Sequence, residues 1–131
     1  MPVRASLCGP TFIVIALMAL ARPARGQAVG ATGASPAARD QAAQIFDERC
    51  SACHGAEGRG DGPGAAALKP KPINFHNLNW QKSVSDAQIA KAIVYGGSAV
   101  GLSNQMAANP DLEDEPDVVN ALVAHVRELG K

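Results

Sequence analysis

The motif Cys50-Ser51-Ala52-Cys53-His54 constrains this chain more than any other feature. Two thiols separated by two residues, with an imidazole directly after the second, form the attachment pattern for c-type haem. Each thiol can add across one porphyrin vinyl group, and the gap lets both sulfurs reach neighbouring pyrrole rings. The adjacent imidazole then lies under the iron as its proximal ligand. The motif therefore predicts one covalently attached haem, held by Cys50, Cys53 and His54.

Three other interpretations of the two cysteines compete with haem. A zinc site needs four ligands in matching spacing, and the remaining candidates Cys8, His76 and His125 form no second pair. A thioredoxin-like redox pair expects a βαβ setting, whereas this motif follows a helical pattern and precedes a glycine-rich loop. A structural disulfide in an oxidising compartment is the third interpretation. The flanking sequence favours haem.

The segment 1–26 has the pattern of a secretory signal peptide. Arg4 gives a short positive start, residues 12–21 form an unbroken apolar run, and small residues precede Gln27. This pattern predicts cleavage before Gln27 and export of the remainder. The run is short for a membrane span, which needs about 20 residues. An uncleaved N-terminal anchor remains the alternative, because Arg22 and Arg25 lie just after the run.

The charge balance excludes one class of partner. The chain has 12 Lys+Arg and 12 Asp+Glu; segment 1–26 holds three of the bases and none of the acids, so cleavage leaves a formal charge of −3. Nucleic-acid binding wants a basic stripe, so we expect no nucleic-acid partner, while a docking partner with a positive rim fits. After cleavage about 105 residues remain, enough for one domain.

The first part of the exported chain divides into a leader and a helix. Residues 27–36 are Ala/Gly/Ser-rich without periodicity, which predicts a flexible leader before a domain at 37–131. Ser35-Pro36 is typical of a helix N-cap followed by proline at the first helical position. The apolar spacing then predicts an amphipathic helix running into the motif, with Ile45 and Phe46 in the core.

Two more helices are expected after the glycine-rich loop at 55–64. Ser85 and Gln88 resemble a capping box before a helix of about ten residues, which Gly96 and Gly97 end. Acids and a proline around 114–117 predict the start of a terminal helix. Its apolar stripe consists of Val119, Leu122, Val123 and Val126. No segment has a strand pattern, so the predicted class is all-α.

The group on the second face of the iron separates function classes. Met106 is the methionine that remains after removal of residues 1–26, and it lies in a Gly/Ser/Asn loop rather than on an apolar helix face. We therefore predict Met106 as the second axial ligand, as in electron-transfer haems. His76 and His125 are the competitors. We expect His76 to face solvent and His125 to be a helix-packing or surface residue.

The order of these features resembles class I cytochrome c over residues 37–130. The matching features are the first helix, the Cys50–Gly55 motif, the glycine loop, Lys-Pro-Lys-Pro at 69–72, a helix ending in Tyr95-Gly-Gly97, the methionine loop and Leu122–Leu129. The resemblance implies three to four helices wrapped around one haem that is attached outside the cytoplasm, hence a periplasmic protein. It also implies packing of Phe46 against Val123 and Val126, with His125 where many members have an aromatic residue.

The resemblance implies two further contacts to the haem. In the family a proline carbonyl accepts a hydrogen bond from the proximal histidine and fixes its ring. Pro70 is the candidate here, with Pro63 and Pro72 left open. Trp80 either packs near a haem propionate or serves as a partly buried core indole.

We therefore expect an exported monohaem cytochrome c that carries one electron between redox proteins and is not an enzyme. Two alternatives stay open. The domain could be the haem subunit of a periplasmic dehydrogenase or oxidase, with the same chemistry and a permanent partner. It could also be a ligand-binding haem protein, gas-sensing or peroxidase-like, although the sequence supplies no distal acid–base pair at a recognisable spacing.

Overall fold

The computed structural model describes residues 33–131. The predicted signal peptide at 1–26 and most of the predicted leader at 27–36 lie outside the described residues and stay predictions. Within residues 33–131 the secondary structure is helical without strands, as the sequence predicts. No helix in this range is both long and apolar enough to cross a membrane.

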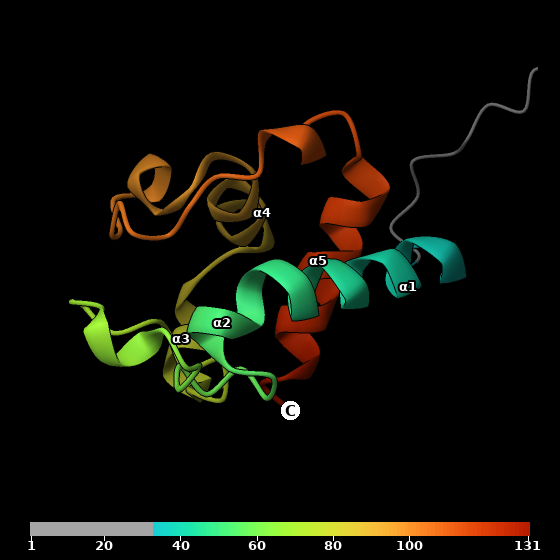
Figure 1. Cartoon of the computed structure of the whole chain (residues 1–131). Helices are drawn as coiled ribbons and strands as arrows, with labels where there is room; N and C mark the ends of the chain where they lie inside the picture. Colours follow the sequence, from blue (N-terminus) through green and yellow to red (C-terminus); the bar gives the residue numbers. More distant parts are fainter. Residues whose placement is uncertain (1–32) are drawn as a thin grey trace, which may run out of the picture. The chain divides into compact units, whose positions relative to one another are not determined.

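The helices and turns follow one another along the chain, with longer loops at 55–64, 68–77 and 101–109 (Figure 1). In order they are α1 (Pro36–Ile45), η1 (Phe46–Cys50), α2 (Ser51–His54), η2 (Ala65–Ala67), α3 (Leu78–Ser83), α4 (Asp86–Tyr95), η3 (Gly97–Val100), η4 (Pro110–Leu112) and α5 (Pro116–Glu128). Segment η1 is a π-helical turn, and η2, η3 and η4 are 3₁₀ turns.

Local capping explains where these helices begin and end. The Ser35 hydroxyl accepts a hydrogen bond from the backbone N–H of Ala38, and Pro36 opens α1. Ser85 and Gln88 form both hydrogen bonds of a capping box at the start of α4. Gly96 ends α4 with a φ of 81°, a left-handed value that favours glycine. These three predictions are confirmed.

The helix that enters the cysteine motif is not a uniform α-helix. Its last turn before the motif is η1, where the backbone N–H of Ser51 donates to the carbonyl of Phe46, five residues earlier. Such π-turns hold one residue more than an α-turn and often lie at functional sites. The apolar spacing predicted one continuous helix here, because a local apolar pattern does not distinguish a π-turn from an α-turn.

The core forms where α1, α4 and α5 meet, and Figure 1 shows α1 crossing α5. Phe46 is buried in this core together with Val123 and Val126, as expected. Its ring also lies 4.5 Å from the ring of His125, measured between centroids. His125 therefore takes the packing place that the resemblance gives to an aromatic residue.

Helix α3 was not predicted from the sequence. It forms hydrogen bonds both to the terminal helix and to the segment that follows the cysteine motif. The Asn77 side chain caps it by accepting hydrogen bonds from two backbone N–H groups. Gln81 in α3 donates to the carbonyls of Phe75 and Val126, at 2.8 and 2.9 Å. Arg127 of α5 donates to the Gln81 carbonyl at 2.7 Å. This network fixes the position of Phe75, on which the site depends.

Candidate cofactor site

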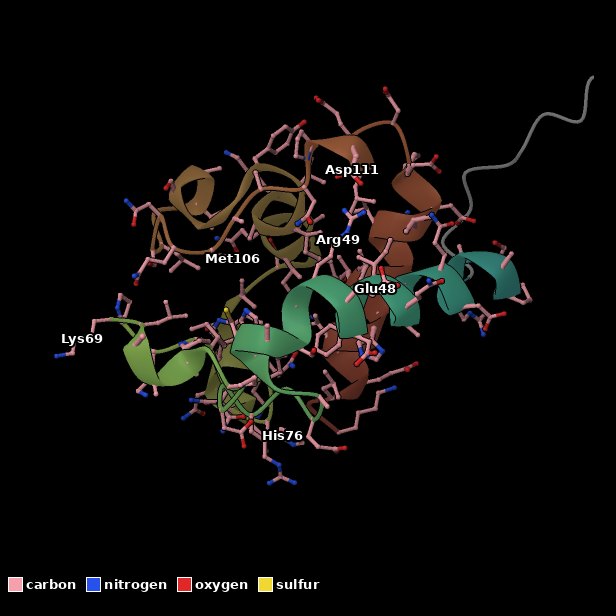
Figure 2. All side chains as sticks on the ribbon, viewed as in Figure 1. Glu48, Arg49, Lys69, His76, Met106 and Asp111 are labelled. Atoms are coloured by element: carbon pink, nitrogen blue, oxygen red, sulfur yellow. The ribbon has the colours of Figure 1, made fainter. Side chains whose placement is uncertain are left out.

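A cavity of about 710 Å³ opens beside the cysteine motif, a size in the usual range for ligand pockets. Two stretches of chain line it, and Figure 2 shows Met106 in the second. The lining residues of the first stretch, called the histidine wall, are Arg49, Cys50, Cys53, His54, Leu68, Pro70, Lys71, Pro72 and Ile73. Those of the second, the methionine wall, are Gly101, Leu102, Ser103, Gln105, Met106, Ala107 and Asn109.

The two cysteines of the histidine wall are free thiols, so no disulfide joins them. Burial raises the pKa of the Cys50 thiol above its ordinary value. The glycine loop holds the motif from behind, since the backbone N–H of Gly64 donates to the carbonyl of Ala52 at 2.8 Å. A Cβ on Gly62 would collide with the carbonyl oxygens of Ser51 and Ala52, so this close approach requires glycine.

His54 is fixed by a hydrogen bond and a ring contact. Its Nδ1 lies 3.2 Å from the carbonyl oxygen of Ile73. A carbonyl only accepts, so Nδ1 carries the proton and Nε2 has its lone pair free for a metal. The ring stacks on Phe75 with centroids 4.6 Å apart. Burial lowers the pKa of His54, which favours the neutral imidazole that binds metals.

The acceptor for His54 corrects one prediction. The carbonyl that faces Nδ1 belongs to Ile73 rather than to Pro63, Pro70 or Pro72. Pro70 and Pro72 line the cavity instead. The physical reason is the hydrogen bond from the Phe75 backbone N–H to the Gly58 carbonyl, at 2.8 Å, which holds the segment around Ile73 against the loop that follows His54. Any residue has a carbonyl, so this contact leaves no signature in the sequence.

Backbone hydrogen bonds to the end of α4 position the methionine wall. The backbone N–H of Gly97 donates to the carbonyl of Met106 at 3.1 Å. Asn109 donates from its backbone to Val94 at 2.9 Å and from its side chain to Ile93 at 2.8 Å. A Cβ on Gly97 would meet the Met106 Cβ at 3.1 Å and collide with the carbonyl oxygen of Ser103. The glycine pair that ends α4 therefore also seats the loop that holds Met106.

Arg49 was missed by the sequence analysis and links the two walls. Its Nη1 lies 2.8 Å from Asp111 Oδ2 and 3.5 Å from Asn109 Oδ1. This hydrogen bond raises the pKa of Arg49 and lowers that of Asp111. Figure 2 shows Arg49 and Asp111 between the cysteine helix and the loop after Met106. Partners some 60 residues apart cannot be paired from a single sequence.

The remaining predicted candidates lie elsewhere. Trp80 is not among the cavity-lining residues; it is partly buried against the core, with its ring 5.4 Å from Phe75. Its propionate contact stays a prediction. His76 is exposed and its Nε2 lies 2.6 Å from the Glu57 carbonyl, while His125 packs on Phe46. Neither competing histidine lines the cavity.

The donor set of the cavity suits c-type haem. One cavity presents two free thiols in the attachment spacing, an oriented neutral imidazole and a thioether. The zinc interpretation finds no support, because no group of three or more His, Cys, Asp or Glu side chains within residues 33–131 is arranged to hold a metal ion.

Comparison with known proteins gives one family. The family described as Cytochrome c matches residues 40–130, which is well over half of the chain. No curated protein matches the chain.

Proposed function

We propose that this chain, which belongs to the cytochrome c family, shuttles single electrons between redox proteins outside the cytoplasm and is not an enzyme. The cofactor of the family is covalently bound haem c, and the chain is a haem-based electron carrier. Haem c supplies an iron that gains and loses one electron. The two axial ligands, the export and the shuttling role are the parts that we propose.

The histidine wall would hold the cofactor at three points. Cys50 and Cys53 would each contribute a sulfur to a thioether bond, which fixes the haem permanently. His54 would bind the iron through Nε2, because its Nδ1 is already committed to the carbonyl of Ile73. This hydrogen bond and the stacked ring of Phe75 orient the imidazole before the cofactor arrives.

The observation that carries the proposal is that Met106 lines the same cavity as His54, from a separate segment. A methionine in this place would fill the second axial position and exclude water and small ligands from the iron. A histidine and a methionine bind both oxidation states, so an electron can pass without a change of ligands. Methionine also raises the reduction potential relative to a second histidine.

Export is supported by the sequence of segment 1–26, with its positive start, apolar run and cleavage pattern. A secretory route also suits a haem that is attached outside the cytoplasm. The partners would be an electron donor and an electron acceptor, both of them redox proteins. A permanent place in a dehydrogenase or oxidase complex would use the same residues in the same roles.

Absorption spectra of the haem-loaded full chain test the axial ligands. We expect low-spin spectra, a sulfur-to-iron charge-transfer band in the oxidised protein, and a reduced spectrum unchanged by carbon monoxide. Met106→Ala should abolish the band and allow carbon monoxide to bind. A high-spin parent protein that binds carbon monoxide would reject the electron-carrier proposal in favour of sensing or catalysis.

A further inference from the structure

Few hydrogen bonds join the two walls of the cavity. Within residues 33–131, those that connect the segment 49–75 with the segment 97–112 come from two places. At one, Arg49 donates to Asn109 and Asp111; we call this contact the arginine bridge. At the other, the backbone N–H of Lys69 donates to the Gln105 side chain at 3.3 Å. The arginine bridge contains the shorter hydrogen bond, at 2.8 Å, and pairs opposite charges.

The arginine bridge acts at the point where the Met106 loop ends. Asn109 follows Met106 by three residues and is itself tied to α4 by two hydrogen bonds. On the other side, Arg49 directly precedes Cys50, so its backbone is part of the haem-attachment helix. Movement of the methionine wall away from the histidine wall would therefore separate the guanidinium from its two acceptors.

We propose that the arginine bridge holds the methionine wall against the histidine wall and so sets how often Met106 leaves the iron. Arg49 and Asp111 are positioning residues in this scheme, because they act through the loop rather than on the cofactor. The inference rests on the Met106 ligation proposed above. Their side chains are 41% and 55% exposed, so the bridge is screened by water. The bridge therefore only tunes the position of Met106. Its loss should raise the apparent affinity of the iron for a ligand that replaces Met106 by about two- to fivefold.

Imidazole titration of the oxidised, haem-loaded full chain measures this exchange, because imidazole binds iron only when Met106 has left it. Loss of the sulfur-to-iron band follows the titration. We expect Asp111→Asn and Arg49→Gln each to raise the apparent imidazole affinity by about two- to fivefold. The double variant should match the single ones, because both remove the same contact. Arg49→Lys should raise the imidazole affinity less than Arg49→Gln does, since lysine keeps the charge but cannot donate to both acceptors in the same geometry.

Asp86→Asn is the matched control. The exposed Asp86 forms an ion pair with the partly buried Arg127 at 2.7 Å, between α4 and α5, and neither residue lines the cavity. The Asp86→Asn variant should leave the imidazole affinity unchanged even if it lowers the unfolding free energy.

Each remaining outcome counts against the bridge. Unchanged affinity in both Asp111→Asn and Arg49→Gln, in a protein that keeps its sulfur-to-iron band, would overturn the bridge alone. An equal rise in Asp86→Asn would assign the effect to general loosening and would also overturn it. A parent protein without the band would reject Met106 ligation and the bridge together.

Discussion

The two walls of the cavity are built in different ways. The histidine wall rests on the core: His54 stacks on Phe75, and the Phe75 ring lies 6.5 Å from that of buried Phe46. The methionine wall is a loop between the 3₁₀ turns η3 and η4, and its anchors are hydrogen bonds to Gly97 and to the end of α4. Met106 itself is only partly buried in the structure.

This difference separates permanent from adjustable parts of one site. A wall supported by a buried aromatic chain moves only if the core is disrupted, which costs several kcal/mol. A wall held by a few hydrogen bonds can open locally, because each contributes only about 1 kcal/mol. We infer that changes in the core should threaten the whole fold, while changes at the loop should affect Met106 first.

The largest effect is expected from Phe46→Ala. Phe46 is buried between Phe75 and His125, so truncation leaves a cavity under the histidine wall. The free energy of unfolding, measured by chemical denaturation of the haem-loaded protein, should fall by about 3–5 kcal/mol. Phe46→Leu, which keeps most of the volume, should lose less. A loss below about 1 kcal/mol for Phe46→Ala would contradict the claim that this wall depends on the core.

A medium effect, confined to the methionine wall, is expected from Gly97→Ala. The new Cβ would collide with the Ser103 carbonyl and crowd Met106, at a cost of about 1–3 kcal/mol. The sulfur-to-iron band should weaken while the far-ultraviolet circular dichroism of the helices is retained.

Gly101→Ala provides the control in the same loop. Gly101 also lines the cavity and has a φ of 75°, but no protein atom lies within 4 Å of an added Cβ, so this variant introduces backbone strain without a clash inside the loop. The band should change less than in Gly97→Ala. Loss of helical signal in Gly97→Ala would show that the two walls are not independent.

The smallest expected effect is a pH dependence of the unfolding free energy that arises from His125, in the core beneath the histidine wall. Burial lowers the pKa of His125, and its Nε2 is buried without a hydrogen-bond partner in the described residues. The unfolded chain therefore takes up this proton first as the pH falls. The contribution of His125 to the unfolding free energy is therefore fully present above a pH of about 6.5, the pKa in the unfolded chain. It is lost as the pH falls from there toward the lower pKa of the folded protein.

His125→Phe should remove this pH dependence while keeping the ring contact with Phe46. Unfolding free energies of parent and variant, compared between about pH 7 and pH 5, should diverge as the pH falls, with the variant less affected. The sulfur-to-iron band is followed in parallel, so that ligand loss is not mistaken for unfolding. Parallel pH profiles would show that His125 does not titrate with folding.

The sequence predicted what short-range chemistry determines. Caps at Ser35, Ser85 and Gly96 are local patterns with a local cause, and all three are present. The all-α class followed from the spacing of apolar residues, and the motif indicated its own cofactor. The structure then brought Cys50, Cys53, His54 and Met106 to one cavity, as their proposed roles require.

The features that the sequence did not predict involve residues far apart along the chain, or backbone groups that every residue has. The Ile73 carbonyl is a backbone atom, and the Arg49–Asp111 contact depends on how two remote segments fold together. Helix α3 had a readable signal, the Asn77 cap, but the helix spans only Leu78–Ser83 and has no apolar stripe of its own. A short helix of this kind is stabilised by its tertiary contacts, here through Gln81.

The π-turn η1 has a consequence for the phase of the helix. Its extra residue rotates everything after Cys50 by about 100° relative to a continuous α-helix, the angle of one residue. Counted along the helix at about 100° per residue, this rotation brings His54 round toward the stripe that α1 buries, Ala38, Ala42 and Ile45. Removal of one residue from 47–49 would leave the five-residue motif intact and yet turn His54 away from the core. The five-residue motif is therefore not enough to orient His54; the helix before it must also have the correct rotation.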